Sequence, residues 1–179
     1  MDKITKQLCD CTDCIVRKLY FANTNLDEMS QLCLRKSQYK FSKGEVIFKT
    51  GDELNNFVYL KSGLLKYYVI LSNGKSQILA IAKPYDTVSL LTIFNNKSLY
   101  HVSALEDSTL CYIPLQQITD LVKVNGVFAL DFLKKLSEAS NTVLAQQMFM
   151  KSKNLSGRIA IVLLRFANEV YNSNTFELP

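Results

Sequence analysis

The chain has 179 residues, of which 48% are hydrophobic and 21% charged, and it contains only six glycines and three prolines. These proportions are those of a folded globular chain, and they exclude collagen-like, linker-like and low-complexity proteins. The formal net charge of +5 at pH 7 permits an acidic partner such as nucleic acid without requiring one.

The residue inventory excludes further classes of protein. No stretch approaches the ~20 continuous apolar residues of a membrane span, and the polar start, with Asp2, Lys3 and Lys6, does not resemble a secretory signal. We therefore expect a cytoplasmic protein without a membrane partner. His101 is the only histidine, which argues against a Ser-His-Asp hydrolase and excludes metal sites built from several imidazoles. Because no glycine-rich nucleotide motif occurs either, the sequence does not predict an enzyme.

Three cysteines crowd into the start of the chain, where Cys9, Cys11 and Cys14 form the run C-D-C-T-D-C. A terminus offers little core to pack against, so this crowding points to metal ligation or redox chemistry. A short helix is predicted over residues 26–34, with Asn25 as its N-cap.

From residue 39 to residue 114 the sequence consists of short β-branched and aromatic runs between turn signals, which predicts a β-barrel or sandwich. The pair Asn73-Gly74 stands between two apolar runs and is the strongest hairpin signal in the chain. We expect a type I′ turn, which requires positive φ at both central residues, and direct pairing of the two flanking strands.

After Pro114 the hydrophobic period becomes helical. A long helix is predicted over about 127–150, with apolar residues spaced by four, three, four and seven at Phe132, Leu136, Ala139, Val143 and Met150. The simpler interpretation is a helix that packs only on its own barrel. We favour a helix that also pairs with a second copy of itself. A further apolar helix is predicted over 157–171, and the sequence stops at Pro179. We expect either that the chain is truncated there or that a partner buries this helix.

Four segments carry a family resemblance: K-G-E-V-I-F-K-T-G-D (43–52), V-Y-L-K-S-G-L-L-K (58–66), A-L-E-D-S-T-L-C-Y-I-P (104–114) and G-R-I-A-I-V-L-L-R-F (157–166). Together they resemble the cyclic AMP receptor protein and FNR (CRP/FNR) family of bacterial transcription regulators. The resemblance implies an α+β, β-rich fold: a cyclic-nucleotide-binding-like double-stranded β-helix or jelly roll, a long dimerisation helix, and the first helix of a truncated winged helix-turn-helix domain.

The same resemblance divides the chain into four parts. They are an N-terminal cysteine-containing segment with a helix (1–36), a β-roll sensor domain (37–122), a dimerisation helix (123–153) and the start of a winged helix-turn-helix domain (154–179).

Relatives that bind cyclic nucleotides hold the ribose with a Gly-Glu pair and the phosphate with an Arg-Ser or Arg-Thr pair. The matching stretch here, 84–103, contains no Arg, Gly or Glu, although a buried phosphate suits the two parallel hydrogen bonds of an arginine. What remains is a degenerate cassette formed by Asp86, Ser89, Leu90, Tyr100 and His101. We therefore expect neither cyclic AMP nor cyclic GMP to be the ligand.

In the oxygen-sensing branch of the family, N-terminal cysteines and one cysteine of the β-roll hold a [4Fe-4S] cluster. Cys11, Cys14 and Cys111 stand at matching places. The family spacing puts the third N-terminal ligand near Tyr20, and Cys9 can take that vacancy because the cluster, like a structural zinc ion, needs four thiolates. The cofactor stays open between a [4Fe-4S] cluster and zinc at Cys9, Cys11, Cys14 and Cys111, with thiol redox chemistry or no functional role as further alternatives.

The sequence thus predicts the sensor and dimerisation portion of a transcription regulator that responds to a redox or small-molecule signal other than cyclic AMP. The expected partners are a second copy, through helix 127–150, and promoter DNA only if a helix-turn-helix follows Pro179, with RNA polymerase as a further partner. The alternative is a stand-alone β-roll that binds a ligand or another protein without binding DNA.

Overall fold

The computed structural model describes residues 15–25, 27, 28, 30, 32, 35–89 and 97–178. The chain divides into two compact units, Met1–Leu136 and Ser137–Pro179. Within the described residues, no helix combines the length and the apolar character needed to cross a membrane.

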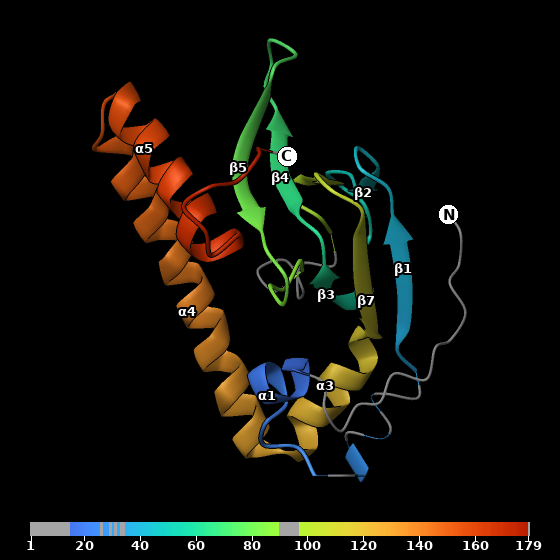
Figure 1. Ribbon diagram of the computed structural model, residues 1–179. Helices are drawn as coiled ribbons and strands as arrows, with labels where there is room; N and C mark the ends of the chain where they lie inside the picture. Colours follow the sequence, from blue (N-terminus) through green and yellow to red (C-terminus); the bar gives the residue numbers. More distant parts are fainter. Residues whose placement is uncertain are drawn as a thin grey trace. The chain divides into compact units, whose positions relative to one another are not determined.

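The first unit contains two antiparallel sheets (Figure 1). One sheet has three strands, in the order β1 (Ser37–Phe41), β7 (Ser108–Pro114) and β3 (Asn56–Ser62). The other has four, in the order β2 (Val46–Phe48), β6 (His101–Ala104), β4 (Leu65–Ile70) and β5 (Ser76–Ala82). The β-rich roll followed by a long helix confirms the predicted fold class.

Alternate side chains of these strands build the core of the roll. Because successive residues of a strand point to opposite faces, Val58 and Leu60 of β3 face inward while Phe57 and Tyr59 belong to the outer face. The buried core consists of Phe41, Val58, Leu60, Leu65, Ala82, Val88, Val102, Ala104, Leu110 and Tyr112. Partly buried aromatic rings, among them Tyr39, Phe48, Tyr67 and Tyr100, pack against it.

The predicted hairpin is confirmed, and its predicted turn type is wrong. Strands β4 and β5 pair directly. Of the two turn residues only Gly74 has a positive φ, at 78°. Its amide donates to Leu71 O at 2.9 Å, and Leu71 N donates to Lys75 O at 2.9 Å. This pattern is a three-residue loop closed by a left-handed glycine, the next most common hairpin after the two-residue type I′ loop.

Helices follow the roll. They are α3 (Leu115–Val124), α4 (Gly126–Lys151) and α5 (Leu155–Arg165), after which a π-helical turn spans Phe166–Val170. Asn154 caps α5 by accepting a hydrogen bond from Gly157 N at 2.9 Å. Ahead of the roll lies α1 (Ile15–Tyr20).

Asn25 is an N-cap, as predicted. Its Oδ1 accepts a hydrogen bond from Glu28 N at 2.8 Å, and Glu28 Oε2 accepts one from Asn25 N at 2.8 Å, which is the reciprocal arrangement of a capping box. Of the helix predicted over 26–34, Asp27, Glu28, Ser30 and Leu32 are helical, and the other positions lie outside the described residues.

Candidate functional site

Two tyrosine side chains pack against the core of the roll at the described part of the degenerate cassette. The rings of Tyr67 and Tyr100 meet edge to face with centroids 5.0 Å apart. Tyr67 OH donates to Thr87 O at 3.3 Å, and Tyr100 OH to Val88 O at 3.4 Å. Burial first, and the neighbouring Tyr100 second, raise the pKa of Tyr67 well above its usual value, so its hydroxyl remains a donor.

Two further cassette residues form hydrogen bonds with the backbone. Ser89 is fully buried and its Oγ accepts a hydrogen bond from Val58 N at 2.9 Å. Asp86 accepts a hydrogen bond from Lys83 N at 3.0 Å, and its own carbonyl accepts one from Leu60 N at 3.0 Å. Both residues therefore hold the connection after β5 against β3, and Leu90 lies outside the described residues.

His101 belongs to the other side of the sheet. Its neighbour Val102 lies in the core, so alternation places His101 on the outer face. There the imidazole stacks on Tyr68, its partner across β4, with centroids 5.0 Å apart. The structure thus separates Tyr100 from His101, which the sequence had grouped.

Calorimetric titration with cyclic AMP is expected to show no saturable binding stronger than about 1 mM. The physical reason is that the stretch 84–103 offers no arginine to a phosphate, and that Tyr67 and Tyr100 pack against the core of the roll beside this stretch. Cyclic GMP, titrated in the same buffer, should give the same heats of dilution. Saturable micromolar binding of either nucleotide would contradict this prediction.

Of the four predicted metal ligands the structure describes Cys111, and Cys9, Cys11 and Cys14 lie outside the described residues. Cys111 is fully buried in β7, the central strand of the three-stranded sheet. Its neighbours Leu110 and Tyr112 face the core, so alternation places Cys111 on the outer face. Within the described part of the chain no three His, Cys, Asp or Glu side chains gather around one point.

A row of residues crosses this outer face on either side of Cys111. Gln38 of β1 and Tyr59 of β3 are its register partners, and both are buried. Lys61 Nζ donates to Gln38 Oε1 at 3.3 Å. Sequence reasoning did not select Gln38, because one polar residue at an alternating position is an ordinary strand pattern.

Helix α1 packs against the same face. The ring of Tyr20 meets Phe57 edge to face at 5.7 Å, and Phe57 stands two residues before Tyr59 on β3. Tyr20 OH also donates to Tyr85 O at 3.3 Å, which ties α1 to the cassette connection. The residue immediately before α1 in the sequence is Cys14.

The segment after α1 contacts the start of α4. Phe21 stacks on Phe128, with centroids 5.7 Å apart and ring planes 9° apart. Asn23 Nδ2 donates to Asp131 Oδ2. Asn125 Nδ2 donates to Asn23 O at 3.1 Å, and Asn125 Oδ1 caps α4 by accepting from Phe128 N at 3.0 Å. This aromatic and polar contact joins the N-terminal segment to the long helix.

The long helix α4 has apolar residues that this chain buries and others that are exposed. Phe132 is buried and packs on Phe57 and Phe128, with centroids 6.1 and 5.7 Å away. The predicted pairing stripe is therefore wrong at its first member, because this chain covers Phe132 itself. The exposed apolar residues that follow a three-and-four spacing are Val127, Leu130, Leu144 and Met148.

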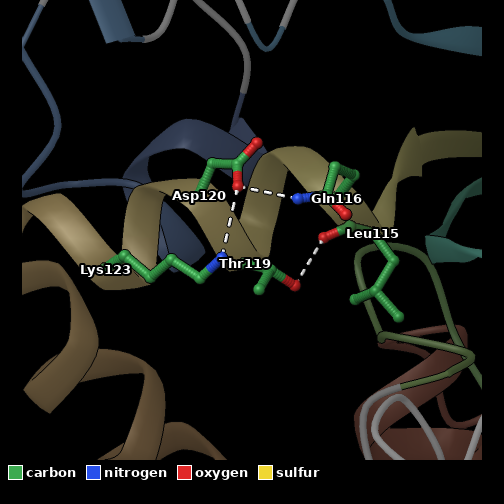
Figure 2. A network of polar contacts seen from close by, with 5 residues as sticks. All are labelled: Leu115, Gln116, Thr119, Asp120 and Lys123. Carbon is green, nitrogen blue, oxygen red and sulfur yellow. Dashed lines mark hydrogen bonds and ion pairs between the residues drawn. The ribbon is translucent and has the colours of Figure 1, made fainter.

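A groove of about 510 Å³ lies outside the roll, beside α3. It is lined by Glu28, Leu32, Arg35, Gln117, Asp120, Leu121 and Val124. Figure 2 shows how Asp120 is engaged within α3: Gln116 Nε2 donates to it at 2.7 Å, and Lys123 Nζ lies 3.8 Å from the same oxygen. The carboxylate is thus compensated by its own helix, and we assign no ligand to this groove.

Comparison with known proteins agrees with this geometry. Residues 38–125 match the family model described as cyclic nucleotide-binding domain. The fumarate and nitrate reduction regulatory protein of Vibrio cholerae is 28% identical over 176 residues, which cover 94% of this chain and 70% of that protein. The anaerobic regulatory protein of Pasteurella multocida is 34% identical over 115 residues, covering 62% of this chain and 41% of that protein.

A solved transcriptional regulator from Thermotoga maritima is 27% identical, with a TM-score of 0.58, and the match covers 70% of this chain and 98% of that one. Fold and family model together define a cyclic-nucleotide-binding-like sensor domain with a long helix behind it. The relatives narrow this class further, because one is a fumarate and nitrate reduction regulatory protein and another an anaerobic regulatory protein, and the resemblance to the CRP/FNR family that the four sequence segments predicted is confirmed.

Proposed function

We propose that this chain is the sensor and dimerisation part of an FNR-type regulator in which Cys9, Cys11, Cys14 and Cys111 hold a [4Fe-4S] cluster. The names of two relatives refer to anaerobic regulation and to fumarate and nitrate reduction, which supports a redox signal. In this proposal the protein regulates transcription and does not catalyse a reaction.

The observation that carries the proposal is the placement of Cys111 and α1 on one face of one sheet. Phe57, which contacts α1, lies on the strand next to that of Cys111 and two residues away from the residue paired with Cys111. At the usual spacings of a sheet, the backbones of Phe57 and Cys111 are therefore roughly 8 Å apart. The six-residue helix α1 is only about 9 Å long. Cys14 directly precedes this helix in the sequence, which supports a shared site with Cys111.

The donor set also fits the group. Four thiolates are what a [4Fe-4S] cluster requires, and the row beside Cys111 contains a buried amide nitrogen, Gln38 Nε2, without a hydrogen-bond partner among the described residues. A buried donor of this kind suits an acceptor such as sulfur. When bound, the cluster would be the group that reacts with oxygen.

The residues of the chain would carry the signal from the cysteines to α4. Cys111 would hold the cluster from the central strand β7, and Cys14 would connect it to α1, which follows Cys14 directly in the sequence. Release of Cys14 frees α1 and the stacked Phe21, whose partner Phe128 lies in the first turn of α4. The equilibrium between packings of α4 then shifts, because the bound group favours only one of them.

The proposed partner of α4 is a second copy of the same helix. Val127, Leu130, Leu144 and Met148 are exposed and follow the three-and-four spacing of a two-helix seam. Promoter DNA and RNA polymerase are the further partners that we propose for a protein that carries the whole DNA-binding domain.

The proposal is tested by measuring iron, acid-labile sulfide and zinc on protein purified without oxygen, with a visible spectrum alongside. We expect about four iron and four sulfide per chain, bleached by air. The variant Cys111→Ser should retain less than about one iron per chain because it lacks one of four ligands. Cys33→Ser replaces the fifth cysteine of the chain and leaves the four proposed ligands in place, so it should keep its iron.

Other outcomes would contradict the proposal. One zinc per chain would indicate a structural zinc site or a thiol switch in place of the proposed iron–sulfur sensor. Absence of both metals would indicate that the signal acts on the β-roll and not on the cysteines. Full iron content in Cys111→Ser would remove Cys111 from the ligand set.

A further inference from the structure

The side chain of Gln38 is held in one orientation. Gln38 is 7% exposed, and its Oε1 accepts a hydrogen bond from Lys61 Nζ at 3.3 Å. An ammonium group can only donate, so Lys61 selects the amide oxygen as its partner and turns the amide nitrogen away from itself.

That amide nitrogen is a buried donor with no acceptor. Gln38 Nε2 is inaccessible to solvent and lacks a hydrogen-bond partner among the residues that the structure describes. Most buried polar atoms in folded proteins are satisfied, so an exception requires an explanation in terms of the molecule. An acceptor that joins the site later is such an explanation.

The position of Gln38 indicates which acceptor this is. Gln38 and Cys111 face each other across β1 and β7, and alternation places both side chains on the outer face of the sheet. Residues paired directly across antiparallel strands have Cβ atoms about 5 Å apart. The amide nitrogen is thus close to whatever the Cys111 sulfur binds.

We propose that Gln38 donates an N–H···S hydrogen bond to a sulfur of the cluster at Cys111 and thereby sets its reduction potential. This inference rests on the proposed function and adds a positioning residue that is not itself a ligand. Hydrogen bonds to cluster sulfurs disperse negative charge and favour the reduced form. Their removal makes the potential more negative, and the cluster is then oxidised more readily in air.

The test compares Gln38→Leu with the wild-type protein, both purified without oxygen. Leucine is close to glutamine in size and has no donor. We expect iron and sulfide contents equal to those of the wild type, a more negative potential in a redox titration, and loss of the visible absorption in air on the order of tenfold faster.

Two further variants complete the design. Gln38→Glu keeps the shape and the bond from Lys61 but loses the donor, so it should shift the potential in the same direction even if leucine disturbs folding. Lys40→Met alters the next outward position of the same strand, two residues away and exposed, and should match the wild type in potential and in rate.

The outcomes separate the two claims. An iron-loaded wild type with unchanged potential and bleaching rate in Gln38→Leu and Gln38→Glu overturns the role of Gln38 and leaves the proposed function standing. An equal shift in Lys40→Met also overturns that role, because the effect would then not be specific to the amide. A wild type without iron overturns both claims.

Discussion

Replacing Phe57 by alanine is expected to lower the free energy of unfolding of the first unit by about 3–5 kcal/mol. Phe57 is fully buried, and its ring lies 5.7 Å from Tyr20, 6.0 Å from Phe21 and 6.1 Å from Phe132. One side chain thus fills the space between α1, β3 and α4. Its removal would leave a cavity among rings that cannot collapse into it together, because Tyr20 and Phe21 belong to the N-terminal segment and Phe132 to α4.

Urea unfolding followed by the circular dichroism of the tyrosines measures this loss, since the chain has nine tyrosines and no tryptophan. Leu99→Ala is the matched control: Leu99 is 59% exposed, so the cost should stay within about 0.5 kcal/mol. A loss below about 1 kcal/mol for Phe57→Ala would mean that α1 does not pack on the sheet in solution.

The second large effect is expected for Gly63→Ala, at about 2–5 kcal/mol, the sum of a left-handed backbone and an overpacked contact. Gly63 has φ +92°, and an added Cβ would lie 2.6 Å from Asp107 O and 2.7 Å from Ser108 Cα, as well as against Ser108 Oγ. Two of these atoms are backbone and cannot rotate away. Ser108 Oγ already donates to Glu106 O at 2.7 Å, so the clash falls on a constrained turn.

Gly44→Ala separates the two causes of this effect. Gly44 has a similar φ of +86°, and an added Cβ would meet nothing within 4 Å. Only the backbone cost remains, about 1–2 kcal/mol. Thermal and urea unfolding of the two variants side by side give the difference, and equal losses would contradict the close approach of the β3–β4 turn to β7.

Much of the roll could be predicted because its signals are local. The apolar runs of β3 and β7 and the pair Asn73-Gly74 depend on neighbours in the sequence, and the strands and the hairpin follow from them. The turn type was mispredicted because Asn73-Gly74 suits two loop lengths. Which loop forms depends on the pairing register of β4 and β5, to which both whole strands contribute.

The site was harder to predict because it depends on contacts between distant parts of the chain. Phe132 has the spacing of a pairing stripe, but Phe57, 75 positions earlier, covers it. The sequence could place Cys111 through a family motif. It could not indicate Gln38, since the pairing of Gln38 with Cys111 and the bond from Lys61 exist only after three strands have assembled.

Asn125 performs two tasks with one side chain. Its oxygen closes the exposed end of α4 through Phe128 N, and its nitrogen holds the carbonyl of Asn23. The amide cannot turn to follow a displaced Asn23 without withdrawing its oxygen from the helix. A displacement of Asn23 would therefore break either its own hydrogen bond with Asn125 or the cap on Phe128 N, so the position of the N-terminal segment and the helical length of α4 are coupled through one amide group.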